Sequence, residues 1–330
     1  MKDFRTILPI IAQKIKIEHQ SGVCLLGSCF AEHISQKLDD AKFQMLQNPF
    51  GILYNPFSIA QSLERMIKNQ PFEKEDLVER NGLWLSFAHH SRYADLDASL
   101  ALKKINKSLD DAHLFLKEAK VLFISLGTAN IYRLKSTNQV VANCHKFPAS
   151  AFDYSLAGKN EIGAILAKAI DSLKVFNPEL HIIFTVSPVR HLKDGLLENQ
   201  LSKSTLLLAV RDLEKQYENV GYFPSYELML DDLRDYRFYE SDLIHPSKLA
   251  VEYIFNYFSQ TYFESATKSM IQEIQKIRNA VYHRPFNAAG QEYQAHLSRT
   301  QQKIQVFKKK HPFVNFRQEE EQLERLRPRQ

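Results

Sequence analysis

The chain has 330 residues, 44% apolar and 25% charged, so it can bury a sizeable core. Its net charge of +5 is uneven, because residues 265–330 hold thirteen Lys/Arg against six Asp/Glu while the preceding part is close to neutral. Three cysteines without a C-x-x-C pair exclude a disulfide framework and a zinc knuckle; without a long apolar run or signal peptide, we expect a cytoplasmic location and no membrane span.

Short apolar runs alternate with longer stretches of helical spacing. In chain order, the pattern predicts a strand over 22–28, a helix over 30–41, a strand over 43–51, a helix over 55–68, a strand over 83–93, a helix over 97–119, a strand over 120–130, a hairpin over 131–144, a helix over 159–175, a strand over 180–191, a helix over 199–218, a strand over 220–230 and a helix over 248–263. Strands that are apolar on both faces and separated by helices are typical of a parallel sheet covered on two sides. We therefore predict a three-layer α/β/α sandwich with a mostly parallel sheet.

The composition changes near residue 265 to Gln, Lys, Glu and Arg with sparse apolar residues. This predicts a first domain over 1–264 and a basic, mainly helical extension over 265–330. The extension mixes basic and acidic blocks. Such mixing favours helices that pack on the body, or that pair with a second copy in a homo-oligomer, over a nucleic-acid-binding surface.

Residues capable of chemistry follow four of the predicted elements, where ligands bind in open α/β sheets. A serine hydroxyl such as that of Ser28 needs a base, which His245 could supply while Asp242 holds the imidazole in the right tautomer. Backbone N–H groups of Ser28 and Gly51, and the side-chain amide of Asn130, could bind an oxyanion. These residues together predict a serine-hydrolase site at the carboxyl edge of the sheet.

Two alternatives concern the first of these segments. Ser28 has the position of an ordinary helix N-cap, a role compatible with that of a nucleophile. Cys29 is a rival nucleophile, because a cysteine at a helix N-terminus has a lowered pKa, although a small apolar packing role is also open to it.

Several histidines lie close to these segments. His89, His145 and His191 lack the spacing of a metal site, so no metal is predicted. Arg190 and His191 end the predicted strand 180–191 at the same edge as Ser28 and are candidates for substrate contact, as is His89.

Seven segments carry a resemblance to a known family. They are LLGSCFAEHI (25–34), NPFGILYNP (48–56), SLGTAN (125–130), SPVRH (187–191), YFPSYE (222–227), LRDYRFY (233–239) and DLIHPS (242–247). Together they resemble the GSCFA family over roughly residues 20–265. That family is in turn similar to the SGNH/GDSL hydrolases, which are α/β/α esterases.

The resemblance implies roles for individual residues. Ser28 stands at the position of the nucleophile, Asp242 and His245 match the D-x-x-H pair, and Gly51 matches the oxyanion glycine. Asn130 comes one residue later than the Asn of the Gly-x-Asn-Asp block in SGNH enzymes.

Asn48, from the same block as Gly51, is grouped with the oxyanion and substrate-binding residues. The expected activity is hydrolysis of an acylated carbohydrate or other small ester, without a cofactor. The alternatives are a non-catalytic binding or assembly module and a hydrolase or acyltransferase that uses Cys29.

Overall fold

The computed structural model describes residues 5–287 and 290–326, and its centre is a five-stranded parallel sheet. The strand order is β10-β9-β5-β1-β2. The strands are β1 (Val23–Gly27), β2 (Met45–Gln47), β5 (Val121–Leu126), β9 (His181–Val186) and β10 (Val220–Tyr222). The register pairs Gly27 of β1 with Ser125 of β5, which brings the ends of these two strands together.

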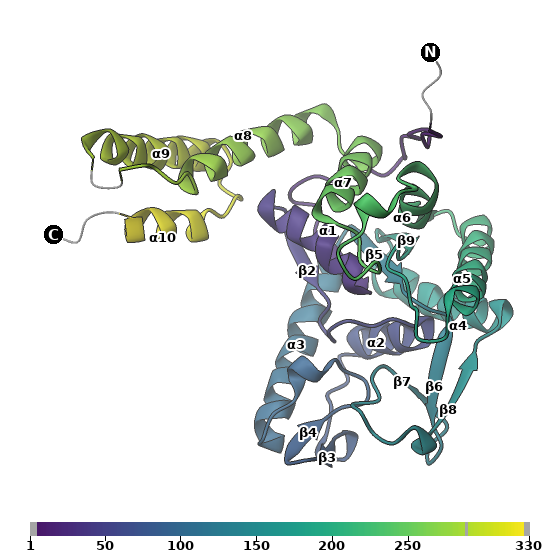
Figure 1. Cartoon of the computed structure of the whole chain (residues 1–330). Coiled ribbons are helices and arrows are strands. Elements are labelled where there is room, and N and C mark those ends of the chain that lie inside the picture. The colour runs from purple at the N-terminus through teal and green to yellow at the C-terminus, as the bar shows by residue number, and fades with distance from the viewer. Residues whose placement is uncertain (1–4, 288–289, 327–330) are drawn as a thin grey trace.

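Helices cover both faces of this sheet (Figure 1). The helices of the body are α1 (Cys29–Asp40), α2 (Pro56–Lys68), α3 (Ala98–Glu118), α4 (Lys159–Phe176), α5 (Leu196–Gln216), the short α6 (Ser225–Glu227) and α7 (Lys248–Tyr262). Side chains alternate along β1, so that Val23 and Leu25 pack with α1 and α7, while Cys24 and Leu26 pack with α2 to α5. The predicted three-layer sandwich is confirmed.

Two smaller sheets lie beyond the strand ends. β6 (Asn130–Leu134) pairs antiparallel with β7 (Gln139–Val141), as the predicted hairpin requires, and with β8 (Phe152–Leu156). β3 (Val78–Arg80) pairs with β4 (Leu83–Leu85). The sequence pattern did not reveal β8, whose residues are mostly exposed and therefore lack a buried face.

Three predicted strands are much shorter in the structure, among them the strand expected over 43–51, of which only β2 (Met45–Gln47) forms. The strand expected over 83–93 ends at Leu85, because the chain turns where His89 N–H donates to Ser86 O. The strand expected over 220–230 ends at Tyr222, and Pro224, which has no N–H for a ladder, precedes a helical turn. In these last two places apolar residues continue in the sequence because they fill a turn that packs on the core.

The C-terminal helices form a group of their own at the upper left of Figure 1, and ion pairs join it to the end of α1. They are α8 (Ser265–Val281), α9 (Gln291–Lys310) and α10 (Arg317–Leu326), and they share an apolar cluster of their own around Ile274, Leu297 and Phe316. The helical extension is confirmed, while the exact boundary at 264 and self-association through these helices stay predictions. No helix in the described residues is long and apolar enough to cross a bilayer.

Candidate active site

Ser28 lies at the turn between β1 and α1. It is the N-cap of α1, and its Oγ accepts a hydrogen bond from Phe30 N at 3.3 Å. The preceding Gly27 has φ +124°, and a Cβ there would lie 2.1 Å from Ser125 O, so only glycine fits beside β5. This tight turn places the Ser28 hydroxyl at the positive end of the α1 dipole, where negative charge on oxygen is stabilised.

The Ser28 hydroxyl is buried and has a second partner, Ser125. The two Oγ atoms are 2.8 Å apart, and Ser28 N–H also donates to Ser125 O at 3.0 Å. Ser125 is fully buried at the paired position of β5. In the part of the chain that the structure describes, no hydrogen bond joins Ser28 to a histidine. No sequence pattern links Ser125 to Ser28, because only the strand register brings the two residues together.

Asp242 and His245 form a hydrogen-bonded pair in the loop before α7. Asp242 Oδ2 lies 2.7 Å from His245 Nδ1, while Oδ1 accepts the N–H groups of Ile244 and His245 at 2.9 and 3.0 Å. These bonds, foremost that of the His245 N–H, lower the pKa of Asp242 to about 2. Leu243 takes up the left-handed conformation that the turn needs, with φ +57°. Asp242 is therefore a carboxylate at neutral pH and fixes the orientation of the imidazole.

The pair lies close to α1, the helix that Ser28 caps. The pKa of His33, on α1, is lowered by burial and next by the charge of His245. Arg190 supports the same turn, because its N–H donates to Ile244 O at 3.2 Å and its guanidinium lies 4.2 Å from the centre of the Tyr239 ring. The structure thus brings the elements that carry Ser28, Asp242 and His245 to one side of the molecule.

The loop after β2 approaches Ser28 from the other side. Asn48 is fully buried, and its Oδ1 accepts the N–H of Gly27 at 2.9 Å. Gly51 has φ +80°, and a Cβ there would lie 2.2 Å from His90 Cβ. Its N–H donates to Asn48 O at 2.7 Å. The glycine is therefore required by this turn, but its amide hydrogen is already used inside the turn.

A pocket of about 420 Å³ opens next to this loop. Asn130, Tyr54, His90, His191 and Lys193 are among the residues that line it. Asn130 is the first residue of β6, and its N–H donates to Thr128 Oγ1 at 3.0 Å. Burial lowers the pKa of His191, which favours a neutral imidazole at this wall of the pocket. Two of the residues expected to contact substrate, Asn130 and His191, thus share one cavity.

His89 lies elsewhere. Its ring is 1% exposed and stacks on Phe50, with the ring centres 4.6 Å apart, and its Nδ1 is 3.0 Å from Ser86 Oγ. Burial lowers its pKa to about 3, so the imidazole stays neutral. The structure places His89 in the core, and the neighbouring His90 lines the pocket.

Helix α5 contributes two polar side chains that hold the loops around the pocket. Asn199 Oδ1 accepts the N–H of His191 at 2.8 Å, and Ser202 Oγ accepts the N–H of Ala129 at 2.8 Å. Both side chains are buried and three residues apart, hence on one face of the helix. The sequence analysis did not single out these two residues. Their three-residue spacing on the apolar face of a helix is the pattern that could have indicated a role in holding loops.

Lys203 adds a buried cation to the same face of α5. Its Nζ donates to Gly127 O at 2.7 Å and to Ser187 O at 2.8 Å, and burial lowers its pKa to about 7. The lysine therefore joins the ends of β5 and β9, and no carboxylate among the described residues pairs with it. Only its burial in the fold reveals this role, because a lysine within the helix predicted over 199–218 is unremarkable in the sequence.

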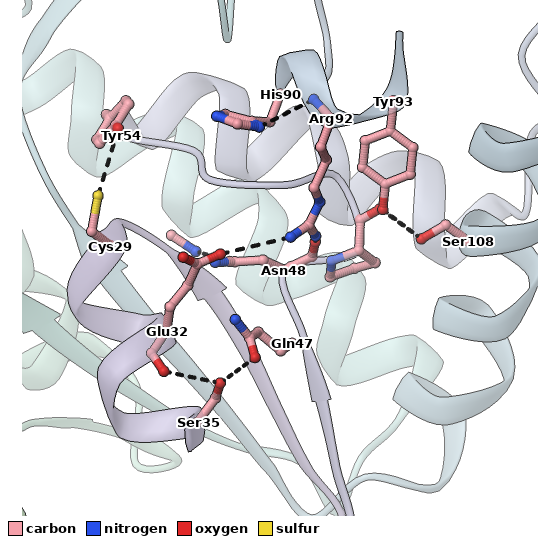
Figure 2. Close-up of polar contacts among 12 residues, drawn as sticks. Cys29, Glu32, Ser35, Gln47, Asn48, Tyr54, His90, Arg92, Tyr93 and Ser108 are labelled. Carbon is pink, nitrogen blue, oxygen red and sulfur yellow. Dashed lines mark hydrogen bonds and ion pairs between the residues drawn. The ribbon is translucent and has the colours of Figure 1, made fainter. Parts of the chain in front are cut away.

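Cys29 faces a different partner from Ser28. Its Sγ is 3.6 Å from the hydroxyl oxygen of Tyr54, and burial is the main cause that raises the pKa of the thiol (Figure 2). A thiol with a raised pKa is a weak nucleophile at neutral pH. Among the described residues no group of three or more His, Cys, Asp and Glu side chains could hold a metal ion.

Three solved structures are similar to the chain at a low level. The family 3 carbohydrate esterase of Clostridium thermocellum is 10% identical, covers 77% of this chain and 98% of its own, and has a TM-score of 0.35. That of Talaromyces cellulolyticus is 9% identical over 78% and 99%, also with a TM-score of 0.35. An acetyl xylan esterase from Butyrivibrio proteoclasticus is 10% identical over 80% and 66%, with a TM-score of 0.36.

Among curated proteins, none matches the chain. Two family profiles do match it. The profile described as "GSCFA domain protein, C-terminal domain" covers residues 274–327, which correspond to the helical extension. The profile described as "GSCFA family" covers residues 22–258, well over half of the chain and all of the proposed site, so the chain belongs to the GSCFA family.

Proposed function

We propose that this protein is a serine hydrolase that cleaves acyl esters, with Ser28 as nucleophile and His245 as general base. The observation that carries the proposal is the Asp242–His245 pair. Because the Asp242 carboxylate accepts from Nδ1, the proton of a neutral imidazole is held on Nδ1. The lone pair on Nε2 is then free to accept the proton of a serine hydroxyl, the role of the base in this chemistry.

The reaction follows from these positions. Ser28 Oγ leaves Ser125, turns to His245 and attacks the acyl carbonyl carbon while its proton passes to Nε2. The tetrahedral intermediate expels the alcohol, which takes that proton. A water molecule then attacks the acyl-enzyme by the same steps and releases the acid. In enzymes of this kind the hydrogen bonds of the resting site are often loose and tighten only with substrate, so the Ser28–Ser125 bond is compatible with the proposal.

The substrate that we propose is a small ester such as an acylated carbohydrate. The pocket beside Asn130 combines amide groups with the aromatic rings of Tyr54, Tyr132 and Phe147. Aromatic rings pack against the apolar faces of sugar rings, and amides bond to hydroxyl groups. A cavity of about 420 Å³ is within the range of small-molecule sites.

A fluorophosphonate probe and a set of acetyl esters test the activity. The probe forms an Oγ–P bond with a nucleophilic serine and loses fluoride. We expect labelling and ester turnover in the wild type and the loss of both in Ser28→Ala. Asp97→Ala is the matched control, because Asp97 is the N-cap of α3 and its loss removes a helix cap without removing the nucleophile. Full activity in Ser28→Ala would contradict the proposal.

The Ser28–Ser125 bond favours a second candidate, a binding module that kept the fold without the chemistry. In that case neither labelling nor turnover occurs. An acetylated sugar would still raise the melting temperature, and Ser28→Ala would leave this increase unchanged.

A further inference from the structure

One buried amide near Ser28 has no hydrogen-bond partner. Asn48 Nδ2 is out of contact with solvent and, among the described residues, has no acceptor within hydrogen-bond distance. Buried polar groups are nearly always satisfied in native proteins, and leaving one unpaired costs about 1–3 kcal/mol. A fold that keeps such a donor next to its proposed nucleophile indicates that a ligand supplies the acceptor.

The orientation of this amide is fixed. The Gly27 N–H can only donate, so the atom that faces it must be Oδ1, and the NH₂ group occupies the other position. Since Oδ1 bonds to the N–H of Gly27, the NH₂ group on the same carbon lies close to Gly27, the residue that precedes Ser28.

The backbone of Asn48 is held as firmly as its side chain. The N–H of Asn48 donates to Leu25 O at 2.8 Å, and Asn48 has a left-handed backbone with φ +42°. Figure 2 shows Arg92 between α1 and the loop after β2, where it donates to the Asn48 carbonyl and lies 3.7 Å from the Glu32 carboxylate. A donor that cannot rotate towards another partner is preorganised for charge that develops in the transition state.

The other expected oxyanion donors are less available. The N–H of Ser28 donates to Ser125 O at 3.0 Å, and the N–H of Gly51 donates to Asn48 O at 2.7 Å. Asn130 lies at the start of β6, one residue later than its expected place, and lines the pocket. Of the four groups, only the Asn48 side chain is held against Gly27, the residue before Ser28, and has a buried N–H donor without a partner in the described part of the chain.

We infer that Asn48 supplies the side-chain donor of the oxyanion hole, so that this function has moved from the loop after β5 to the loop after β2. The inference rests on the proposed function, because an oxyanion forms only if Ser28 attacks an acyl group. During attack the carbonyl π bond opens, the electron pair moves to oxygen, and Asn48 Nδ2–H donates to that oxygen.

The test is Asn48→Asp, which keeps an oxygen for the Gly27 N–H and replaces the NH₂ donor by a carboxylate oxygen, with Asn48→Gly as the uncharged second variant. We expect kcat for acetyl esters and the rate of fluorophosphonate labelling to fall about 100- to 1000-fold, with KM changed little. If this variant does not fold, Asn48→Gly removes the same donor and suits the positive φ. Asn69→Asp is the matched control, since Asn69 is also left-handed with an unpartnered buried amide oxygen but lies at the end of α2.

The outcomes separate the two proposals. A wild type that is not labelled and does not hydrolyse esters overturns both. A labelled wild type with unchanged rates in Asn48→Asp overturns the inference alone, as does a loss confined to Asn130→Asp. A loss in Asn48→Asp, with less than a tenfold loss in Asn130→Asp and none in Asn69→Asp, supports the inference.

Discussion

Helix α1 connects two regions that bury polar groups in different ways. At its start is the carboxyl edge of the sheet, where the polar side chains of Ser28, Asn48 and Lys203 are buried and Lys203 has no carboxylate partner among the residues that the structure describes. At its end is the seam with the C-terminal helices, where Asp40, Lys42, Arg278 and Glu319 pair with one another. These four residues form the seam network.

The seam network consists of oppositely charged groups that pair with one another. The fully buried Glu319 lies 2.8 Å from Lys42 Nζ and 2.9 Å from Arg278, which also lies 2.6 Å from Asp40. Buried charges of opposite sign depend on one another, because removal of one partner leaves an uncompensated charge. At the sheet edge, by contrast, Lys203 bonds only to backbone carbonyl groups among the described residues, and the Asn48 NH₂ group has no partner there. If the proposed function holds, changes at the edge should alter activity, whereas changes at the seam should alter stability.

We expect the largest effect on kcat from Asp242→Asn, at the sheet edge. An amide at position 242 can donate to His245 Nδ1, which moves the imidazole proton to Nε2 and removes the base. We expect kcat to fall about 10⁴-fold. Because the turn is exposed, we expect the melting temperature to change little. Ester hydrolysis and thermal unfolding are the two measurements.

Asp235→Asn is the control for this change. Asp235 also accepts a backbone N–H in a short turn, that of Arg237, but has no histidine beside it. A drop in kcat that is equal in both variants would show that the turns act only through the fold.

Glu319→Gln should have the opposite profile. It leaves Lys42 buried without the carboxylate that pairs with it, while Arg278 keeps Asp40. Removing one partner of a buried ion pair typically costs about 3–5 kcal/mol of the free energy of unfolding. The kcat of the folded fraction should stay within twofold. Chemical denaturation measures the first quantity, and active-site titration with the fluorophosphonate measures the second.

Glu321→Gln serves as its control, because Glu321 makes only an exposed pair with Arg317 and should cost less than about 0.5 kcal/mol. If Glu319→Gln reduced kcat strongly while the protein stayed folded, the seam would take part in the chemistry and the contrast would fail.

Lys203→Met tests the buried cation through pH. Because the folded pKa of about 7 is below the unfolded value of about 10.4, the unfolded state binds more protons between these limits. The stability of the wild type therefore gains, relative to the variant, about 1.4 kcal/mol per pH unit as the pH rises through this window. Denaturation at pH 7.5, 8.5 and 9.5 measures the gain.

The exposed Lys215→Met on the same helix should show no such gain. A difference between wild type and Lys203→Met that stayed constant with pH would mean that Lys203 is charged throughout. It would then resemble the cations of the seam.

The sequence was sufficient for those features that depend on local pattern. The apolar runs and helical spacings predict the sandwich, and the strand-turn-helix pattern at Ser28 and the three-residue spacing of Asp242 and His245 predict features that the chain forms locally. Features that depend on tertiary packing could not be predicted from the sequence. Ser125 meets Ser28 only through strand register, and which of His89 and His90 turns inward is decided at Ser86. The burial of Lys203 depends on how α5 docks against two strand ends.

Cys29→Ala should have the smallest effect. The thiol is next to Ser28 in sequence, yet it contacts the Tyr54 hydroxyl rather than the dyad, and its pKa is raised mainly by burial. If Ser28 is the nucleophile, kcat and the labelling rate should stay within threefold of the wild type, and any label should still map to Ser28 by peptide mass. If the label in the wild type mapped to Cys29 instead, and labelling vanished in Cys29→Ala, the sheet edge would still be the reactive region. Its nucleophile would then be a thiol. The contrast with the seam would then hold while the identity of the nucleophile changed.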